Sequence, residues 1–149
     1  MILEEESTLE NTLIAAAARV LNPYTTTGGR LFGDVGAAVL SDGGRVYLGV
    51  CVDTSGWGLC AERSALAAMI TAGEYKVRKV VAVWRDARDQ QLYILPPCGI
   101  CRDFMHHVDE DNLEADVILG RGKTAKLKDL LPNYQWPEPL DGDVALRRE

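Results

Sequence analysis

The order of helical and strand-like segments predicts an α/β protein, a three-layer α/β/α sandwich built on a mixed five-stranded sheet. Three observations lead to this fold class. An amphipathic helical pattern opens the chain, five short β-rich segments follow it, and further helical patterns fall between them. With 149 residues, of which 47% are hydrophobic, the chain can form one compact core but is too short for two ordinary domains.

The first element is a helix predicted over residues 8–21. Ser7 and Glu10 have the spacing of a capping box, and apolar residues then recur at intervals of three and four. Asn22-Pro23 ends this pattern. Residues 24–33 are rich in threonine and glycine, and we expect them to form a loop without core contacts.

A β-hairpin and a mostly buried helix follow. The hairpin pairs two β-rich runs, 35–40 and 45–52, which flank a Ser-Asp-Gly-Gly turn. The helix covers residues 60–71 and ends at Gly73, a residue that tolerates a left-handed cap. The remaining elements rest on the same kinds of pattern: strands over 77–84, 91–95 and 115–119, a helix over 99–108 and a helical turn over 126–131.

Charge and composition narrow the classes of function. The formal net charge is −6, so a phosphate-backbone partner is disfavoured and we expect no nucleic acid. An acidic N-terminus and the absence of an apolar run of about 20 residues predict a cytoplasmic protein without a membrane segment. In a reducing compartment, four cysteines favour metal binding or catalysis over disulfides.

Two short cysteine motifs carry the strongest chemical signal. Cys98 and Cys101 form a C-x-x-C pair that opens a predicted helix, and Cys60 opens another. Helix N-termini stabilise thiolates, so the two motifs can face one point. Three sulfurs leave one position of a tetrahedral zinc open, as in catalytic sites. The alternatives are a structural site closed by Cys51, a non-catalytic zinc module, and a redox pair that uses Cys98 and Cys101 alone.

Cys60-Ala61-Glu62 together with Pro97-Cys98-Gly99-Ile100-Cys101-Arg102 resembles the zinc signature of the cytidine deaminase family, in its small three-cysteine branch. The likeness covers most of residues 8–136, so we expect residues 1–136 to be the catalytic domain and 137–149 a mobile tail. It implies one Zn²⁺ per chain on Cys60, Cys98 and Cys101. It also implies hydrolytic deamination of a cytosine-type nucleoside, with water as co-substrate.

The resemblance further implies roles for residues beside the ligands. Glu62 matches the proton shuttle that serves the attacking water, the ring nitrogen and the leaving amine. Arg63 and Arg102 resemble arginines that hydrogen-bond the thiolates, although either could face solvent. The Ala61 N–H and the Pro97 carbonyl match the backbone groups that hold the base.

The sugar-binding segment departs from the family pattern. Nucleoside deaminases carry Asn-x-Glu-Asn where this chain has Cys51-Val52-Asp53-Thr54. A thiol is a poor replacement for an amide, whereas Asp53 can still accept a hydroxyl. Cytidine or deoxycytidine is therefore one expected substrate. A cytosine nucleoside antibiotic such as blasticidin S is the other, because the loop before Cys60 is short and contains glycine, as in that branch.

Aromatic residues complete the predicted site. Trp57, Tyr134 and Trp136 are expected either to contact substrate or to pack between subunits. The three-cysteine deaminases are tetramers, so the resemblance implies a homotetramer whose subunits complete one another's pockets. A nucleic-acid base deaminase ranks third, because such an enzyme needs phosphate contacts that an acidic chain does not favour.

Overall fold

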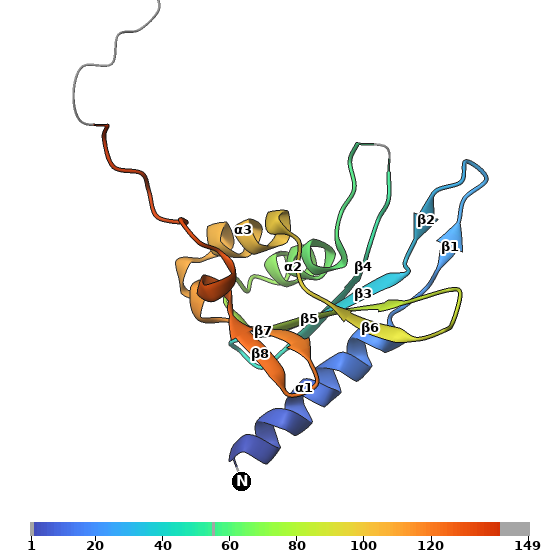
Figure 1. The fold of residues 1–149 in the computed structure, drawn as a ribbon, viewed down its shortest axis with the longest axis horizontal. Coiled ribbons are helices and arrows are strands. Elements are labelled where there is room, and N and C mark those ends of the chain that lie inside the picture. The colour runs from blue at the N-terminus through green and yellow to red at the C-terminus, as the bar shows by residue number, and fades with distance from the viewer. Residues whose placement is uncertain (1, 55, 141–149) are drawn as a thin grey trace, which may run out of the picture.

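The computed structural model describes residues 2–54 and 56–140, which form a six-stranded main sheet with helices on both faces and a separate two-stranded sheet (Figure 1). The sheet has the order β4-β3-β5-β7-β8, and β6 pairs with β5 beside β7. β5 and β7 are parallel, whereas the other pairs are antiparallel. The sheet strands are β3 (Val35–Ser41), β4 (Val46–Val50), β5 (Val77–Arg85), β6 (Leu92–Leu95), β7 (Asp116–Gly120) and β8 (Lys123–Lys126).

Helix α1 (Ile2–Arg19) covers one face of the sheet, and α2 (Ala61–Thr71) and α3 (Gly99–Val108) cover the other (Figure 1). The alternation of side chains along β3 explains this division. Ala37 and Val39 belong to the core under α2, whereas Ala38 and Leu40 belong to the core under α1. The predicted three-layer α/β sandwich with a mixed sheet is therefore confirmed.

The prediction of five sheet strands was wrong, because β8 is a sixth. Its sequence, Lys-Thr-Ala-Lys, lacks the alternation of a half-buried strand, and backbone pairing with β7 holds it at the sheet edge. The short helices η1 (Glu110–Glu114) and η2 (Leu127–Leu130) have 3₁₀ geometry. η1 was not predicted, whereas η2 coincides with the helical turn expected over 126–131.

Two further expectations need correction. α1 reaches back to Ile2, so Ser7 and Glu10 lie inside the helix and do not cap its start. Contacts remote in sequence stabilise that first part, since Glu6 and Glu10 both form ion pairs with Lys79 of β5. Residues 24–33 are not wholly loop, because β1 (Tyr24–Thr25) pairs with β2 (Leu31–Phe32).

Helix α2 lies unusually close to the sheet at Gly49 of β4. A Cβ at this position would lie only 2.3 Å from the backbone nitrogen of Ala65 and 2.8 Å from the carbonyl oxygen of Ala61. Only glycine permits this approach, which sets the position of the helix that begins just after Cys60.

In the described segments, no helix has the length and apolarity required to cross a membrane. Residues 137–140 are exposed. The rest of the expected mobile tail, residues 141–149, lies outside the described residues, and the division of the chain at residue 136 stays a prediction.

Candidate functional site

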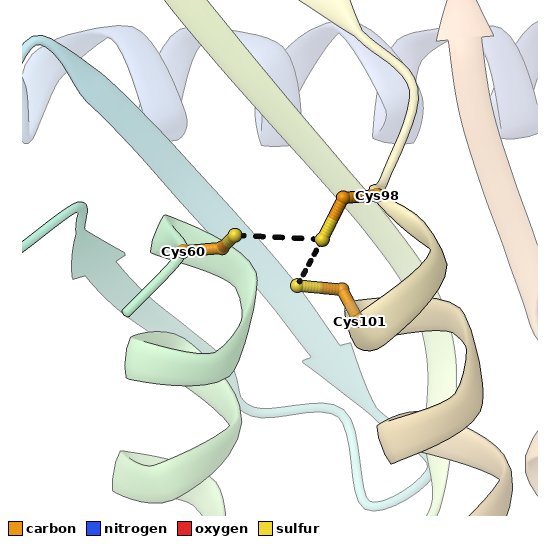
Figure 2. Close-up of side chains that lie close together, drawn as sticks. All are labelled: Cys60, Cys98 and Cys101. Atoms are coloured by element: carbon orange, nitrogen blue, oxygen red, sulfur yellow. Dashed lines mark hydrogen bonds between the residues drawn. The ribbon is translucent and has the colours of Figure 1, made fainter. Parts of the chain in front are cut away.

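The three cysteines predicted to bind metal lie together where two helices begin. Cys60 is the N-cap of α2, and Cys98 is the N-cap of α3, which carries Cys101 in its first turn. Figure 2 shows their side chains converging from the two helices. The Cys60 and Cys98 sulfurs are 3.5 Å apart, and those of Cys98 and Cys101 are 3.6 Å apart. These cysteines are free thiols, not disulfides.

This geometry fits a zinc ion. A tetrahedral Zn²⁺ with sulfur ligands at about 2.3 Å separates neighbouring sulfurs by about 3.8 Å. The three Sγ atoms all lie within 4.8 Å of one another, and Cys51 is not part of the group. Its thiol instead donates to Oδ1 of Asp34 at 3.1 Å. The structure thus brings together three sulfurs, which leaves one position of a tetrahedral metal open.

The surroundings of Cys98 and Cys101 act in opposite directions on the ionisation of these two thiols. Burial raises the pKa of Cys101, and the nearby Glu62 and Cys60 raise it further. Burial also raises the pKa of Cys98. Hydrogen bonds from the backbone N–H groups of Cys101 and Ile100 and from the neighbouring thiols outweigh burial, so the net effect is a lowered pKa. The helix N-terminus thus favours one thiolate, and a bound metal would supply the charge that favours all three.

The two arginines expected beside the thiolates differ in their contacts. Nη2 of Arg63 lies 3.7 Å from Sγ of Cys60 and donates to the Gly58 carbonyl at 3.2 Å. Arg102 instead donates from Nε to the Pro97 carbonyl at 2.8 Å and from Nη1 to the Leu130 carbonyl at 3.0 Å. Arg63 therefore has the geometry expected of a thiolate partner, whereas Arg102 joins the segment before Cys98 to η2.

Glu62 and two of the three metal thiols, those of Cys60 and Cys98, line one small cavity of about 160 Å³. Glu62 is only 5% exposed, and burial raises its pKa, although its own backbone N–H and the Cys101 thiol partly offset this effect. Fully buried Ala61 also lines the cavity, next to N–H groups of the first turn of α2 that have no intrahelical acceptor. The cavity walls are completed by Val35, Cys51, Cys60, Leu95, Pro96 and Cys98.

Some of the residues predicted to contact substrate lie together at this cavity. Ala61 and Cys51 line it, and Pro97 adjoins it between Pro96 and Cys98. The Pro97 carbonyl accepts from Arg102 but keeps a second lone pair for a ligand. Burial raises the pKa of the Cys51 thiol, and its hydrogen bond to Asp34 raises it further. Asp53 is exposed two residues beyond Cys51.

The sequence did not identify three apolar lining residues, Val35, Leu95 and Pro96, or the acceptor Asp34. Pro96 carried a usable signal, because it immediately precedes the Pro-Cys motif. The others become visible only when β3, β4 and β6 are brought together.

The three predicted aromatic contacts do not line this cavity. Trp57 and Trp136 are 86% and 92% exposed, and Tyr134 packs edge-on against His106 with ring centroids 5.3 Å apart. Their predicted role at a subunit interface or a shared pocket stays a prediction.

Comparisons with known proteins agree with this geometry. Residues 11–114 match the family model of the cytidine and deoxycytidylate deaminase zinc-binding region. A Dictyostelium discoideum protein named "Probable cytidine deaminase" is 40% identical over 72 residues, 47% of this chain and 46% of the relative. A cytidine deaminase from Halalkalibacterium halodurans is 37% identical over 73 residues, 48% of this chain and 52% of the relative. The matches thus span about half the length of these curated relatives.

Similarity to a solved structure covers more of the chain. The crystal structure of cytidine deaminase from Mycobacterium leprae superposes with a TM-score of 0.65 and 27% identity, covering 83% of this chain and 97% of the other. The family match includes all three cysteines, Glu62 and Arg63. This chain therefore belongs to the family defined by the cytidine and deoxycytidylate deaminase zinc-binding region.

Proposed function

We propose that this protein is a zinc-dependent aminohydrolase that removes the amino group from the cytosine ring of a nucleoside, cytidine or deoxycytidine. The observation that carries the proposal is the position of a buried carboxylate, Glu62, in a small cavity that is also lined by Cys60 and Cys98, two of the three converging thiols. Neither a structural zinc site nor a redox pair requires a buried carboxylate to transfer protons.

Cys60, Cys98 and Cys101 would hold the metal. Zinc, when bound, supplies a Lewis acid that makes water nucleophilic at neutral pH. Three thiolates carry more negative charge than the metal can cancel, and the guanidinium of Arg63 near Cys60 offsets part of it. The N-termini of α2 and α3 offset another part.

Glu62 would move the protons. Its carboxylate, at the second residue of α2, is positioned to take a proton from the attacking water and transfer it to ring N3. The same group would then take the second proton of that water and pass it to the departing amine. Burial of this side chain favours its protonated form, which suits a group that must hold a proton between two transfers.

Backbone groups would hold the ring. The Ala61 N–H, at the cavity, would donate to a ring substituent, and the carbonyl of Pro97, which adjoins the cavity, would accept from the amino group. A cavity of about 160 Å³ is smaller than the roughly 300–1,000 Å³ of ordinary ligand pockets. It is therefore suited to a single ring, and the sugar must lie at its mouth.

A substrate panel tests this proposal. Zinc-loaded protein should release ammonia and form the corresponding uracil product from cytidine or deoxycytidine, and it should leave adenosine unchanged. Blasticidin S belongs in the same panel, because a deaminase of that antibiotic stays an alternative prediction. Release of no ammonia from any cytosine compound by protein with a full complement of zinc would contradict the proposal.

We also infer a homotetramer in the cytoplasm. Large apolar side chains, Trp57, Ile100 and Trp136, are more than half exposed in the single chain, and Ile100 lies between two metal-binding cysteines. Association would bury such side chains. Sedimentation at assay concentration should give the mass of four chains, and removal of residues 133–149 should weaken assembly or substrate binding without loss of zinc. A fully active monomer would contradict this inference.

A further inference from the structure

Asp34 is fixed beside the cavity by an unusual set of bonds to Cys51. The Gly33 N–H donates to the Cys51 carbonyl at 3.1 Å, and the Cys51 N–H donates to the Val35 carbonyl at 3.0 Å. Asp34 is therefore bracketed by two backbone hydrogen bonds to one residue. The Cys51 thiol donates to Oδ1 of Asp34 at 3.1 Å, and the Arg85 N–H donates to the Asp34 carbonyl at 3.4 Å. The backbone bonds fix the position of the residue, and rotation of its carboxylate away from Cys51 would break the hydrogen bond from the thiol.

This carboxylate adjoins the cavity through two of the residues that line it. Cys51 and Val35, its hydrogen-bond partner and its chain neighbour, both line the cavity. Asp34 itself is half-buried. A ring that fills the cavity must direct whatever group it carries toward the mouth. The Cys51 thiol lines this cavity, and the Asp34 carboxylate that accepts from it is the adjoining acidic side chain.

Two acidic residues, Asp34 and Asp53, lie close to Cys51 in the structure or in the sequence. The ion pairs formed within residues 2–54 and 56–140 include none to Asp34 or to Asp53, which follows Cys51 by two residues. Cys51 occupies one oxygen of Asp34, and Oδ2 has no hydrogen-bond partner in the same described residues. Such a carboxylate attracts hydroxyl or amine donors and repels a phosphate.

We propose that Asp34, held by Cys51, is the residue that determines which substituent the cytosine ring carries: it selects an unphosphorylated nucleoside and rejects a nucleotide. The inference rests on the proposed deaminase function. It matters because the description of the family covers both cytidine and deoxycytidylate, which differ in charge by a phosphate.

The test compares deoxycytidine with deoxycytidine monophosphate in wild type and Asp34→Asn. Removing one negative charge should raise the ratio of kcat/KM for the nucleotide to that for the nucleoside on the order of tenfold, or about 1.4 kcal/mol. The gain should come mainly through KM for the nucleotide and should shrink as salt is added. Asp42→Asn is the matched control, because it removes the same charge at the exposed β3–β4 turn and should leave the ratio unchanged.

Cys51 variants provide a second arm if Asp34→Asn does not fold. Cys51→Ser keeps a donor to Asp34 and should keep the preference, whereas Cys51→Ala frees the carboxylate and should weaken it. Equal ratios in wild type, Asp34→Asn and Cys51→Ala would overturn the proposal, and so would a wild type that deaminates the nucleotide as well as the nucleoside.

Calorimetry with the products separates this proposal from the proposed function. Deoxyuridine and deoxyuridine monophosphate report on the same discrimination without turnover, and the wild type should bind the nucleoside more tightly. If the wild type shows no turnover but still binds deoxyuridine more tightly than its monophosphate, the proposed deaminase activity is wrong and the role of Asp34 stands. Binding that does not distinguish the two products in wild type would overturn the role of Asp34, whatever the activity.

Discussion

Replacing Gly49 by alanine should displace the metal-binding helix without touching the metal site directly. The new Cβ would meet the Ala65 nitrogen at 2.3 Å and the Ala61 carbonyl oxygen at 2.8 Å, and neither backbone atom can rotate away. Ordinary contact begins at 3.4 Å, so α2 must retreat by about 1 Å. A displacement of that size can reduce the rate about a hundredfold, whereas overpacking alone destabilises by about 1–3 kcal/mol.

Gly36→Ala is the matched control for strain. Its Cβ would lie 2.3 Å from the Ala17 carbonyl oxygen and 2.8 Å from Cγ1 of Val20, so it displaces α1 on the opposite face. Urea unfolding should show comparable destabilisation of both variants. Turnover and zinc competition with a chelator, measured where both are folded, should be impaired in Gly49→Ala alone. Equal activity loss in the two variants, or normal activity in Gly49→Ala, would refute the claim that this contact positions Cys60 and Glu62.

Three other predictions concern metal binding and stability. Cys98→Ser should lose most of its zinc in elemental analysis, because it removes the ligand that lies between the other two sulfurs, and full retention would contradict the assigned site. Lys79→Met should lower the free energy of unfolding in urea by about 3–5 kcal/mol, because Lys79 is 2% exposed and forms ion pairs with Glu6 and Asp116. An unchanged free energy would mean that these ion pairs do not stabilise the fold. Burial of Asp116 opposes its ionisation, but hydrogen bonds from Lys126 and Lys79 outweigh burial and lower the pKa of Asp116 below its ordinary value. The ionised Asp116 therefore stabilises the folded state above about pH 4, and this contribution is lost as the pH falls through the pKa of the folded state. Unfolding free energies measured from pH 6 to pH 2 should therefore fall more steeply for wild type than for Asp116→Asn, and parallel curves would contradict the assignment.

Local motifs made the metal site predictable. Cys98 and Cys101 belong to one helical turn, and Cys60 likewise stands where a glycine-containing loop enters a helix. Because helix N-termini favour thiolates, their convergence followed from sequence, and the structure confirms it. The hairpin and the buried β5 were predictable for a similar reason, since their hydrophobic patterns are continuous.

Features held by remote contacts were not predictable. β8 has a polar sequence and depends on backbone bonds to β7, whereas the start of α1 depends on Lys79, more than 60 residues away. The pairing of Asp34 with Cys51 crosses 17 positions and matches no motif, so the sequence showed only that Cys51 departed from the family pattern. The expectation that Arg102 approaches the thiolates rested on its place beside Cys101 and on the family resemblance, and in the structure its guanidinium donates to two carbonyls.

Glu62→Gln tests the central claim most directly, with zinc content and cytidine turnover measured on the same preparation. Glutamine keeps the shape of the side chain but cannot transfer protons, so zinc should stay near one per chain while turnover falls by several orders of magnitude. Glu110→Gln, which removes an exposed carboxylate from η1, should leave both quantities unchanged. Near-normal turnover in Glu62→Gln would contradict the assignment of Glu62 as the proton shuttle of a zinc-dependent deaminase.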